Sequence, residues 1–286
     1  DWSSDVCSSD LPQVVWQHFQ TLCTIPRPSK HEQQLREFLQ NWAESRNLET
    51  YVDEVGNLII RKDATAGKEH VPGVILQGHL DMVTQANTGT VHDFFKDPIR
   101  PVLEDGWLIA KDTTLGADNG IGVALALAVL DSNDIAHGPI EVLLTVDEEA
   151  GMSGARLLQA GVLKGKWLFN IDTEEWGELY LGCAGSIDVE VEQLLNCEPI
   201  PENLNIVNIQ VVGLKGGHSG VDIHLGRGNA NVILARFLNQ HLAKLGGRLV
   251  EFIGGTARNA LPREAVATIA ISSNQLPELE KLLAER

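Results

Sequence analysis

Short apolar runs that alternate with helical segments constrain the fold of this chain more than any other feature. Four runs bounded by turn residues are typical of strands, at residues 57–61, 74–77, 140–146 and 168–171. Residues 120–130, rich in alanine and leucine, and residues 154–160 are predicted to be helical. Strands that alternate with helices predict an α/β fold with a mainly parallel, helix-flanked sheet.

Two helices are expected before the first strand. Apolar residues recur there at helical spacing, in two groups separated by prolines: Val15, Phe19 and Leu22, then Leu35, Phe38, Leu39 and Trp42. Residues 1–11 are rich in serine and aspartate and show no periodicity, so we expect them to be a non-native leader.

The pattern of the sequence changes past Gly185. Alternating runs at residues 187–191 and 206–212 predict strands, and a glycine-rich loop leads from them to a predicted helix at 230–245. This order is typical of an α+β domain. We therefore expect one domain over residues 12–184 and a smaller one over 185–286.

The charge balance argues against several classes of partner. The formal net charge is -17 and the pI is near 4.9, so phosphate backbones and anionic lipid surfaces would be repelled. The four cysteines form no Cys-x-x-Cys pair, and no apolar stretch is long enough to span a bilayer. We expect a cytoplasmic protein that binds a small solute and neither nucleic acid nor membrane.

Four segments rich in acidic residues or histidine follow predicted strands or precede a predicted helix. They are GHLD at 78–81, GADNG at 116–120, DEE at 147–149 and NID at 170–172. In an open α/β sheet the strand ends meet at one crevice, so these segments can come together there. The sequence therefore predicts a metal site.

The residue types suit two divalent ions, which need imidazole and carboxylate ligands with one bridging carboxylate. His79 supplies the imidazole, and the candidate carboxylates are Asp118, Glu149 and Asp172. In an extended His-x-Asp segment both side chains share a face, so Asp81 can accept the second ring proton of His79.

The adjacent glutamates Glu148 and Glu149 cannot both point the same way on a strand. This favours a division in which Glu149 binds metal and Glu148 is the general base.

Each segment also has an ordinary structural explanation. Asp118 could be a helix N-cap, and the glutamate pair could be a solvated strand end. His79 could be a hydrogen-bonded core histidine and Asp172 a turn residue. Four such segments in one order, three of them ending apolar strands, are difficult to explain by capping and solubility alone.

Longer motifs carry a resemblance to a known family. The segments IPRPSKHE at 25–32, LQGHLDMV at 76–83, TTLGADNGIG at 113–122 and TVDEEAGM at 145–152 resemble the aminoacyl-histidine dipeptidases, also called cytosol non-specific dipeptidases or peptidases D. These are two-zinc exopeptidases related to carnosinases and aminoacylases. The resemblance extends from Pro12 to the end of the chain.

The resemblance implies a role for each candidate residue. One zinc is expected on His79 and Asp172 and the other on Glu149, with Asp118 bridging them through a cis peptide to the next residue. Asp81 is expected to support His79, and Glu148 to be the general base. Two segments, GGHSG at 216–220 and NALP at 259–262, resemble lid motifs, which makes His218 and Asn259 candidates for substrate and oxyanion binding.

The resemblance also implies a phosphorylase/hydrolase-like zinc exopeptidase fold with an inserted α+β lid. It implies two divalent ions, zinc with cobalt or manganese as alternatives, and a homodimer at full length. Family members are longer and return to the catalytic domain with a final histidine ligand. We therefore expect a fragment, truncated inside the lid and inactive alone.

The expected reaction is metal-dependent hydrolysis of unblocked dipeptides, including Xaa-His dipeptides such as β-alanyl-histidine. A deacylase of N-acyl amino acids, or another amidohydrolase on the same metal centre, is the alternative, because fold and metal do not determine substrate. Two further alternatives are a metal-free glycosidase with Glu148 and Asp118 flanking a sugar, and a non-catalytic peptide-binding module.

Overall fold

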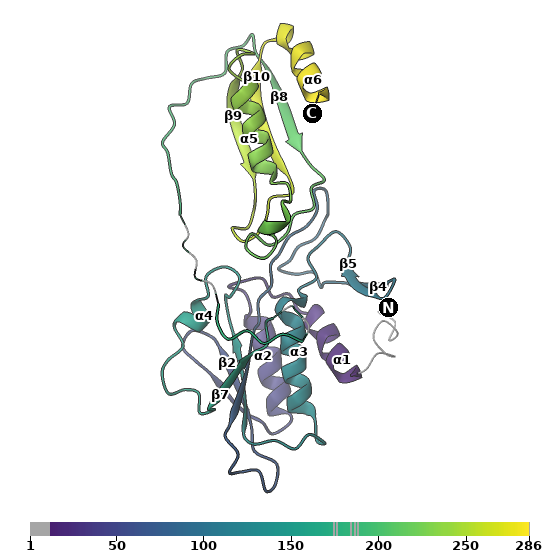
Figure 1. Ribbon diagram of the computed structural model, residues 1–286, viewed down its shortest axis with the longest axis vertical. Helices are drawn as coiled ribbons and strands as arrows, with labels where there is room; N and C mark the ends of the chain where they lie inside the picture. Colours follow the sequence, from purple (N-terminus) through teal and green to yellow (C-terminus); the bar gives the residue numbers. More distant parts are fainter. Residues whose placement is uncertain are drawn as a thin grey trace. The chain divides into compact units, whose positions relative to one another are not determined.

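The computed structural model describes residues 12–173, 175, 177–183, 185, 187 and 189–285. The expected leader at residues 1–11 lies outside the described residues. The chain divides into two compact units, residues 1–184 and 185–286, and each is described by itself (Figure 1).

A five-stranded sheet forms the centre of the first unit, in the order β1-β2-β6-β3-β7. Its strands are β1 (Glu49–Val52), β2 (Leu58–Lys62), β3 (Val74–His79), β6 (Ile140–Thr145) and β7 (Trp167–Asn170). The sheet is mixed, because β3 is parallel to β6 and β7, whereas β2 is antiparallel to β1 and β6. The expected α/β class is confirmed, although the parallel pairs make up only half of the sheet.

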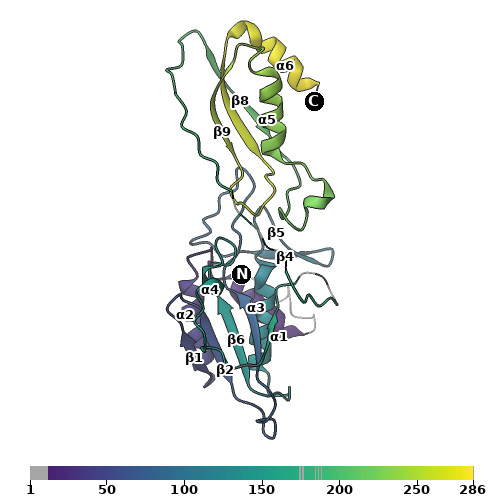
Figure 2. The same ribbon diagram turned by 60° about the vertical axis from the view of Figure 1, so that its left-hand side comes forward.

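Three helices pack on one face of this sheet, as Figure 2 shows: α1 (Gln13–Cys23), α2 (Gln33–Glu44) and α3 (Ala117–Asp131). Leu58 and Ile60 of β2 and Val142 of β6 point into this main core and are fully buried. Ile59 and Leu143 point to the other face, where a smaller cluster contains Leu158 and its neighbours. Burial on both faces explains why these strands are almost continuously apolar.

The loop after β6 contains less helix than the sequence predicts. Residues 154–160 were expected to be helical, but α4 covers only Ser153–Arg156. Gly154 packs directly on the end of β6, since a Cβ there would lie 2.7 Å from the Val146 backbone nitrogen. The chain then leaves the helix so that Leu158 can pack on the sheet.

A hairpin of β4 (Pro101–Glu104) and β5 (Trp107–Ala110) lies between β3 and α3 in the chain. The sequence analysis missed it, together with β1. β1, β4 and β5 are strands of only four residues, and each pairs with an antiparallel neighbour. Runs this short give little signal in the sequence.

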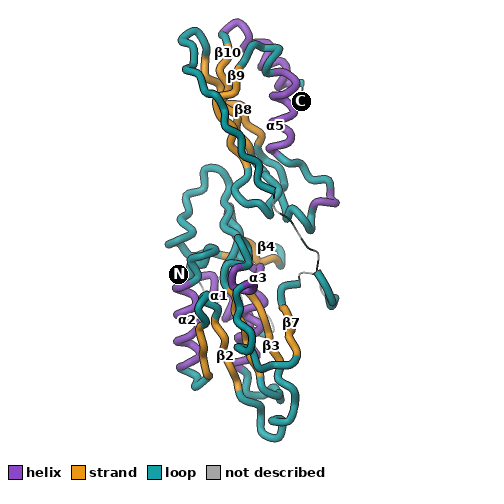
Figure 3. The backbone as a smooth tube through the Cα atoms, turned by 90° about the vertical axis from the view of Figure 1, so that its left-hand side faces the viewer, coloured by secondary structure: helices purple, strands orange, loops and turns teal. Residues whose placement is uncertain are grey.

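The second unit is an α+β structure with a three-stranded antiparallel sheet in the order β8-β10-β9 (Figure 3). The strands are β8 (Asn205–Val211), β9 (Arg248–Gly254) and β10 (Ala265–Ile271), and the α-helices are α5 (Ala230–His241) and α6 (Leu276–Ala284). α5 and α6 bury apolar side chains, among them Leu234 and Leu279, against one face of this sheet. The strand expected at 187–191 does not form among the described residues of that range.

Candidate metal centre

β3 ends at His79, whose side chain is almost completely buried. The Nδ1 atom of its ring lies 3.1 Å from the backbone oxygen of Asp81 and 3.3 Å from Oδ1 of the same residue. A carbonyl oxygen can only accept a hydrogen bond, so Nδ1 carries the hydrogen. The Nε2 atom is thereby directed at the carboxylates of the site, as in a histidine prepared to bind metal.

The start of α3 brings Asp118 to this imidazole. Gly116 has a left-handed backbone conformation, with φ of 74°, and the peptide bond from Asp118 to Asn119 is cis, as the resemblance implied. Oδ1 of Asp118 lies 3.0 Å from Nε2 of His79. The side chain of Asp118 is about half exposed. It therefore lies between the buried histidine and solvent.

Asp172 reaches the same point from the residues that follow β7, with Oδ1 at 3.6 Å from Nε2 of His79. The Asn119 side-chain amide holds it there, because Nδ2 of Asn119 donates to the Ile171 carbonyl at 2.7 Å and to Oδ1 of Asp172. The Asn119 side-chain oxygen accepts a hydrogen bond from the backbone nitrogen of His79 at 3.3 Å. Asn119 thus joins three segments of the site.

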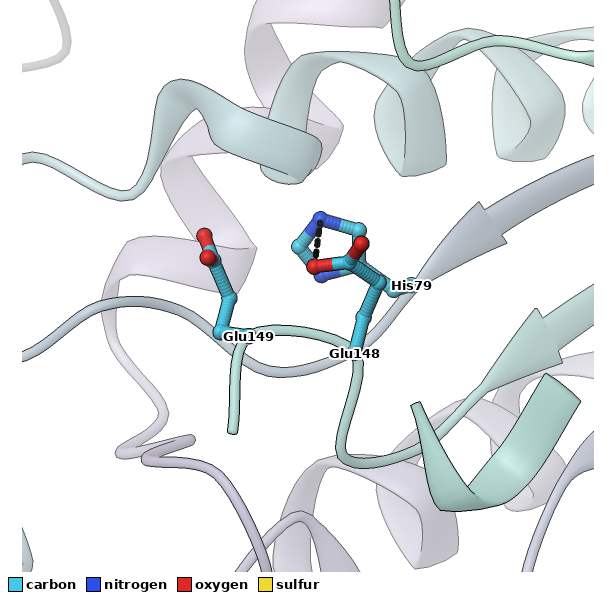
Figure 4. Close-up of side chains that lie close together, drawn as sticks. All are labelled: His79, Glu148 and Glu149. Atoms are coloured by element: carbon cyan, nitrogen blue, oxygen red, sulfur yellow. Dashed lines mark ion pairs between the residues drawn. The ribbon is translucent and has the colours of Figure 1, made fainter. Parts of the chain in front are cut away.

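Glu148 and Glu149 lie in a turn that follows β6, not on the strand itself. Strand alternation therefore does not separate the two side chains, contrary to the reasoning from sequence. The Asp81 carboxylate orients the turn instead, since its two oxygens accept the backbone N–H groups of Glu148 and Glu149, each at 3.0 Å. Figure 4 shows the Glu148 carboxylate beside the His79 ring, with 4.0 Å between Oε2 and Nε2.

Two overlapping groups of side chains have donor atoms within 4.8 Å of one another: His79, Asp118 and Asp172, and His79, Glu148 and Glu149. Nitrogen and oxygen donors of this kind suit zinc, cobalt or manganese. Three protein donors with room for water are also the usual complement of a catalytic zinc. The donor set and the orientation of His79 therefore fit a divalent metal.

The pKa shifts show how strongly these groups interact. Burial acts to lower the pKa of His79, but hydrogen bonds to Asp118 and Asp81 outweigh it and raise the pKa to about 10. Burial, with the negative charge of Asp118, raises the pKa of Glu149 to about 7. Burial also raises the pKa of Asp172 to about 6. Glu149 and Asp172 thus resist ionisation, and such perturbed carboxyl groups are typical of a functional site that a cation would stabilise.

Several supporting residues were missed by the sequence analysis. The Ser29 hydroxyl donates to Oδ2 of Asp81 at 2.7 Å, and Oε1 of buried Glu32 accepts the backbone N–H of Asp147 at 2.8 Å. The loop between α1 and α2 therefore supports the end of β3 and the turn after β6. The motif at residues 25–32 contains both residues, but only the fold shows what they contact.

The two remaining candidates, His218 and Asn259, belong to the second unit, where they lie in neighbouring loops. The Ser219 backbone N–H donates to the Asn259 carbonyl at 2.8 Å. Nδ1 of His218 accepts the backbone N–H groups of Gly220 and Val221, both at 3.1 Å. Nδ1 therefore carries a lone pair, and Nε2 is the donor of the neutral ring.

None of the helices in the described part of the chain combines the length and apolarity that crossing a bilayer requires.

Comparisons with known proteins relate the chain to a peptidase family. Residues 75–270 match the model of peptidase family M20/M25/M40. The chain is 52% identical over 272 residues to the cytosol non-specific dipeptidase of Escherichia coli (strain K12), a match that covers 95% of this chain and 56% of that protein. Peptidase T of Salmonella arizonae is 44% identical over 77 residues, which is 25% of this chain and 19% of that protein.

A solved structure shows the same fold. The aminoacylhistidine dipeptidase of Vibrio alginolyticus superposes with a TM-score of 0.62 at 48% sequence identity, covering 98% of this chain and 57% of that one. The chain thus spans little more than half the length of these relatives. The family match covers well over half of the chain and includes the site from His79 to Asp172. The chain belongs to peptidase family M20/M25/M40.

Proposed function

We propose that this chain is part of a cytoplasmic metallo-dipeptidase that hydrolyses unblocked dipeptides, including Xaa-His dipeptides such as β-alanyl-histidine. The observation that carries the proposal is the convergence of the donor atoms of His79, Asp118 and Asp172 beside two further carboxylates. The identity to a dipeptidase over almost the whole chain supports this substrate class. We further propose zinc as the metal and a homodimer at full length.

In this proposal His79 and Asp172 would hold one ion, Glu149 would hold a second, and Asp118 would be shared between them. Asp118 suits the shared role because its carboxylate lies 3.0 Å from the Nε2 atom of His79 and its negative charge also acts on Glu149. Asp81 keeps the hydrogen on Nδ1 of His79, so that Nε2 presents its lone pair. A divalent metal bound there supplies a Lewis acid that lowers the pKa of water and polarises a carbonyl group.

Glu148 is the proposed general base. It takes a proton from the attacking water and passes that proton to the amine that leaves when the peptide bond breaks. Asp81 orients this glutamate through the backbone N–H of residue 148. The general base and the histidine ligand are therefore both positioned by Asp81.

His218 is proposed to bind the oxyanion of the tetrahedral intermediate. Its Nδ1 is occupied by two backbone N–H donors, which leaves an Nε2–H group to donate. Asn259 is proposed to contact the substrate from the adjoining loop, which is hydrogen-bonded to Ser219.

A chimeric enzyme tests the proposal. Residues 12–285 would replace the matching segment of the full-length Escherichia coli relative, and the product would be assayed on β-alanyl-histidine and on N-acetylated amino acids. We expect chelator-sensitive hydrolysis of the dipeptide, restored by zinc, cobalt or manganese. Activity on N-acyl amino acids alone would identify a deacylase. Binding of the dipeptide without turnover would identify a peptide-binding module.

A further inference from the structure

Arg27 is a buried arginine beside the metal centre. It lies in the loop between α1 and α2 and is only 3% exposed. Burying a guanidinium group is costly unless hydrogen bonds and opposite charges compensate. The contacts of this side chain should therefore indicate why the cost is tolerated.

The guanidinium group joins the two chain segments that carry His79 and Asp118. Its Nη1 atom donates to the carbonyl oxygens of Leu80 and Asp81, each at 2.9 Å. Its Nη2 atom donates to the carbonyl oxygen of Gly116. These acceptors lie one or two residues from His79 or Asp118, so one side chain spans both segments of the site.

One of these contacts leads directly to the histidine. The Asp81 carbonyl oxygen that accepts from Arg27 also lies 3.1 Å from Nδ1 of His79. The guanidinium group therefore fixes an oxygen that keeps the hydrogen on Nδ1. Through that oxygen it also acts on the direction of the Nε2 lone pair.

Two glycines leave room for the guanidinium group. A Cβ at Gly116 would lie 2.6 Å from Nη2 of Arg27, and a Cβ at Gly120 would lie 2.8 Å from the same atom. These glycines are on either side of Asp118 in the chain. The start of α3 is thus packed closely against the Arg27 side chain.

Arg27 also places a positive charge among acidic groups. Burial lowers the pKa of Arg27, and the charges of Cys23, Asp81, Asp118 and Glu149 act in the opposite direction. Arginine stays protonated across the physiological range, so these acids lie near a permanent cation.

We propose that Arg27 is a positioning residue of the metal centre, which sets the spacing between His79 and Asp118 and holds the Asp81 carbonyl against the His79 ring. This inference rests on the metal centre of the proposed function. It predicts that Arg27 affects metal affinity and coordination geometry without contacting the metal.

The test is titration of the metal-free 286-residue chain with Co²⁺, followed by its visible absorption, and with Zn²⁺ against a chromophoric chelator. We expect Arg27→Met to weaken metal binding about 10- to 100-fold, the usual effect of losing a residue that orients a ligand. Arg27→Lys should give an intermediate loss, because an ammonium group keeps the charge but cannot span the same carbonyls. Arg46→Met removes an exposed arginine that lies just past the end of α2 and should leave metal affinity unchanged.

A double-mutant cycle tests the packing independently. Gly120→Ala should displace the guanidinium group and weaken metal binding in the Arg27 background. The added methyl group would also meet the Phe19 ring in every background, so only the part of the loss that is due to Arg27 should shrink in the Arg27→Lys or Arg27→Met background. If Arg27→Met does not fold, the metal affinities of Gly120→Ala, Arg27→Lys and the double variant are sufficient to test the inference.

The inference is overturned if folded Arg27 variants bind metal like the parent chain with an unchanged cobalt spectrum. It is also overturned if the effects of Gly120→Ala and the Arg27 substitution simply add. Titration of the parent chain shows whether the metal centre binds metal at all. A failure of the proposed metal centre is therefore distinguished from a failure of the role of Arg27.

Discussion

At the scale of single residues, Glu148 and Glu149 are neighbours in one turn but have different proposed roles, Glu148 as the general base and Glu149 as a metal ligand. We expect Glu148→Gln to lower turnover of the chimeric enzyme about 10²- to 10⁴-fold while its metal content stays unchanged, because a base and not a ligand is lost. Glu149→Gln is the matched control and should lose metal. Metal analysis beside the rate checks both. A missing metal equivalent in Glu148→Gln would reverse the assignment.

Asp81 joins several parts of the candidate site. Its carboxylate accepts from Ser29, from the backbone of both glutamates and from the His79 ring. We expect Asp81→Ala to weaken metal binding about 10- to 100-fold in protein that is still folded. Asp131→Ala, which removes a carboxylate paired with exposed Arg46, is the control. Unaltered affinity in a zinc competition titration would contradict the role of Asp81.

The pKa shifts predict an unusual dependence of stability on pH. The pKa of Asp172, of Glu149 and of His79 is raised in the metal-free fold, to about 6, 7 and 10 respectively. A raised pKa means that the native state holds protons which the unfolded state releases, so this stabilisation is lost as pH rises through those values. The pKa of Asp118 is lowered by His79 although burial opposes the shift, and its effect is confined to acid below this range.

We therefore expect the urea midpoint of chelator-treated protein to fall between about pH 5 and about pH 9. Metal-saturated protein should show the opposite trend, because its ligands must lose their protons to bind. Urea unfolding followed by circular dichroism at several pH values checks both. A midpoint of the metal-free protein that rises over this interval would contradict the shifts.

At the scale of elements, the buried strands of the first sheet were predictable, whereas the short strands β1, β4 and β5 were not. β3 and β6 are buried on both faces, so their apolar runs are visible without knowledge of their neighbours. The run at 187–191 alternates equally well yet forms no strand in its described residues, because a strand also needs a hydrogen-bonding partner. A local pattern cannot supply that partner.

The convergence of the candidate ligands was predictable for a similar reason. The segments of His79, Asp118 and Asp172 follow or precede apolar elements, and sheet topology brings the ends of such elements together. Arg27 could not be found this way. It donates to backbone carbonyls 53, 54 and 89 residues away, and a backbone acceptor leaves no trace in the sequence.

Strand β7 lies at an edge of the first sheet and exposes three large apolar side chains, Trp167, Leu168 and Phe169, each by about half. An exposed apolar edge strand is a template for pairing between chains. We expect Phe169→Lys to reduce self-association of the 286-residue chain, measured by sedimentation velocity. Phe38→Lys, on the exposed side of α2, is the matched control and should have little effect. Equal self-association of Phe169→Lys and the parent chain would show that β7 is not the contact.

At the scale of the whole molecule, the donors of the described residues predict how many ions the chain binds. His79, Asp118 and Asp172 offer one imidazole and two carboxylates to a first ion. A second ion would depend on Glu149 and a share of Asp118, and carboxylates without an imidazole of their own should hold zinc weakly at neutral pH. We therefore expect one tightly bound zinc per 286-residue chain and negligible hydrolysis of β-alanyl-histidine beside the full-length Escherichia coli relative.

Native mass spectrometry of zinc-saturated protein after buffer exchange, with the hydrolysis assay on the same sample, would count the ions and measure the rate. Asp172→Asn should then release the one tight ion, because it removes a ligand charge without removing the hydrogen bond from Asn119. Glu149→Gln should leave that ion in place in this chain, although it should cost the chimeric enzyme its second metal. Two tight ions with ordinary turnover would show that another residue completes the second site.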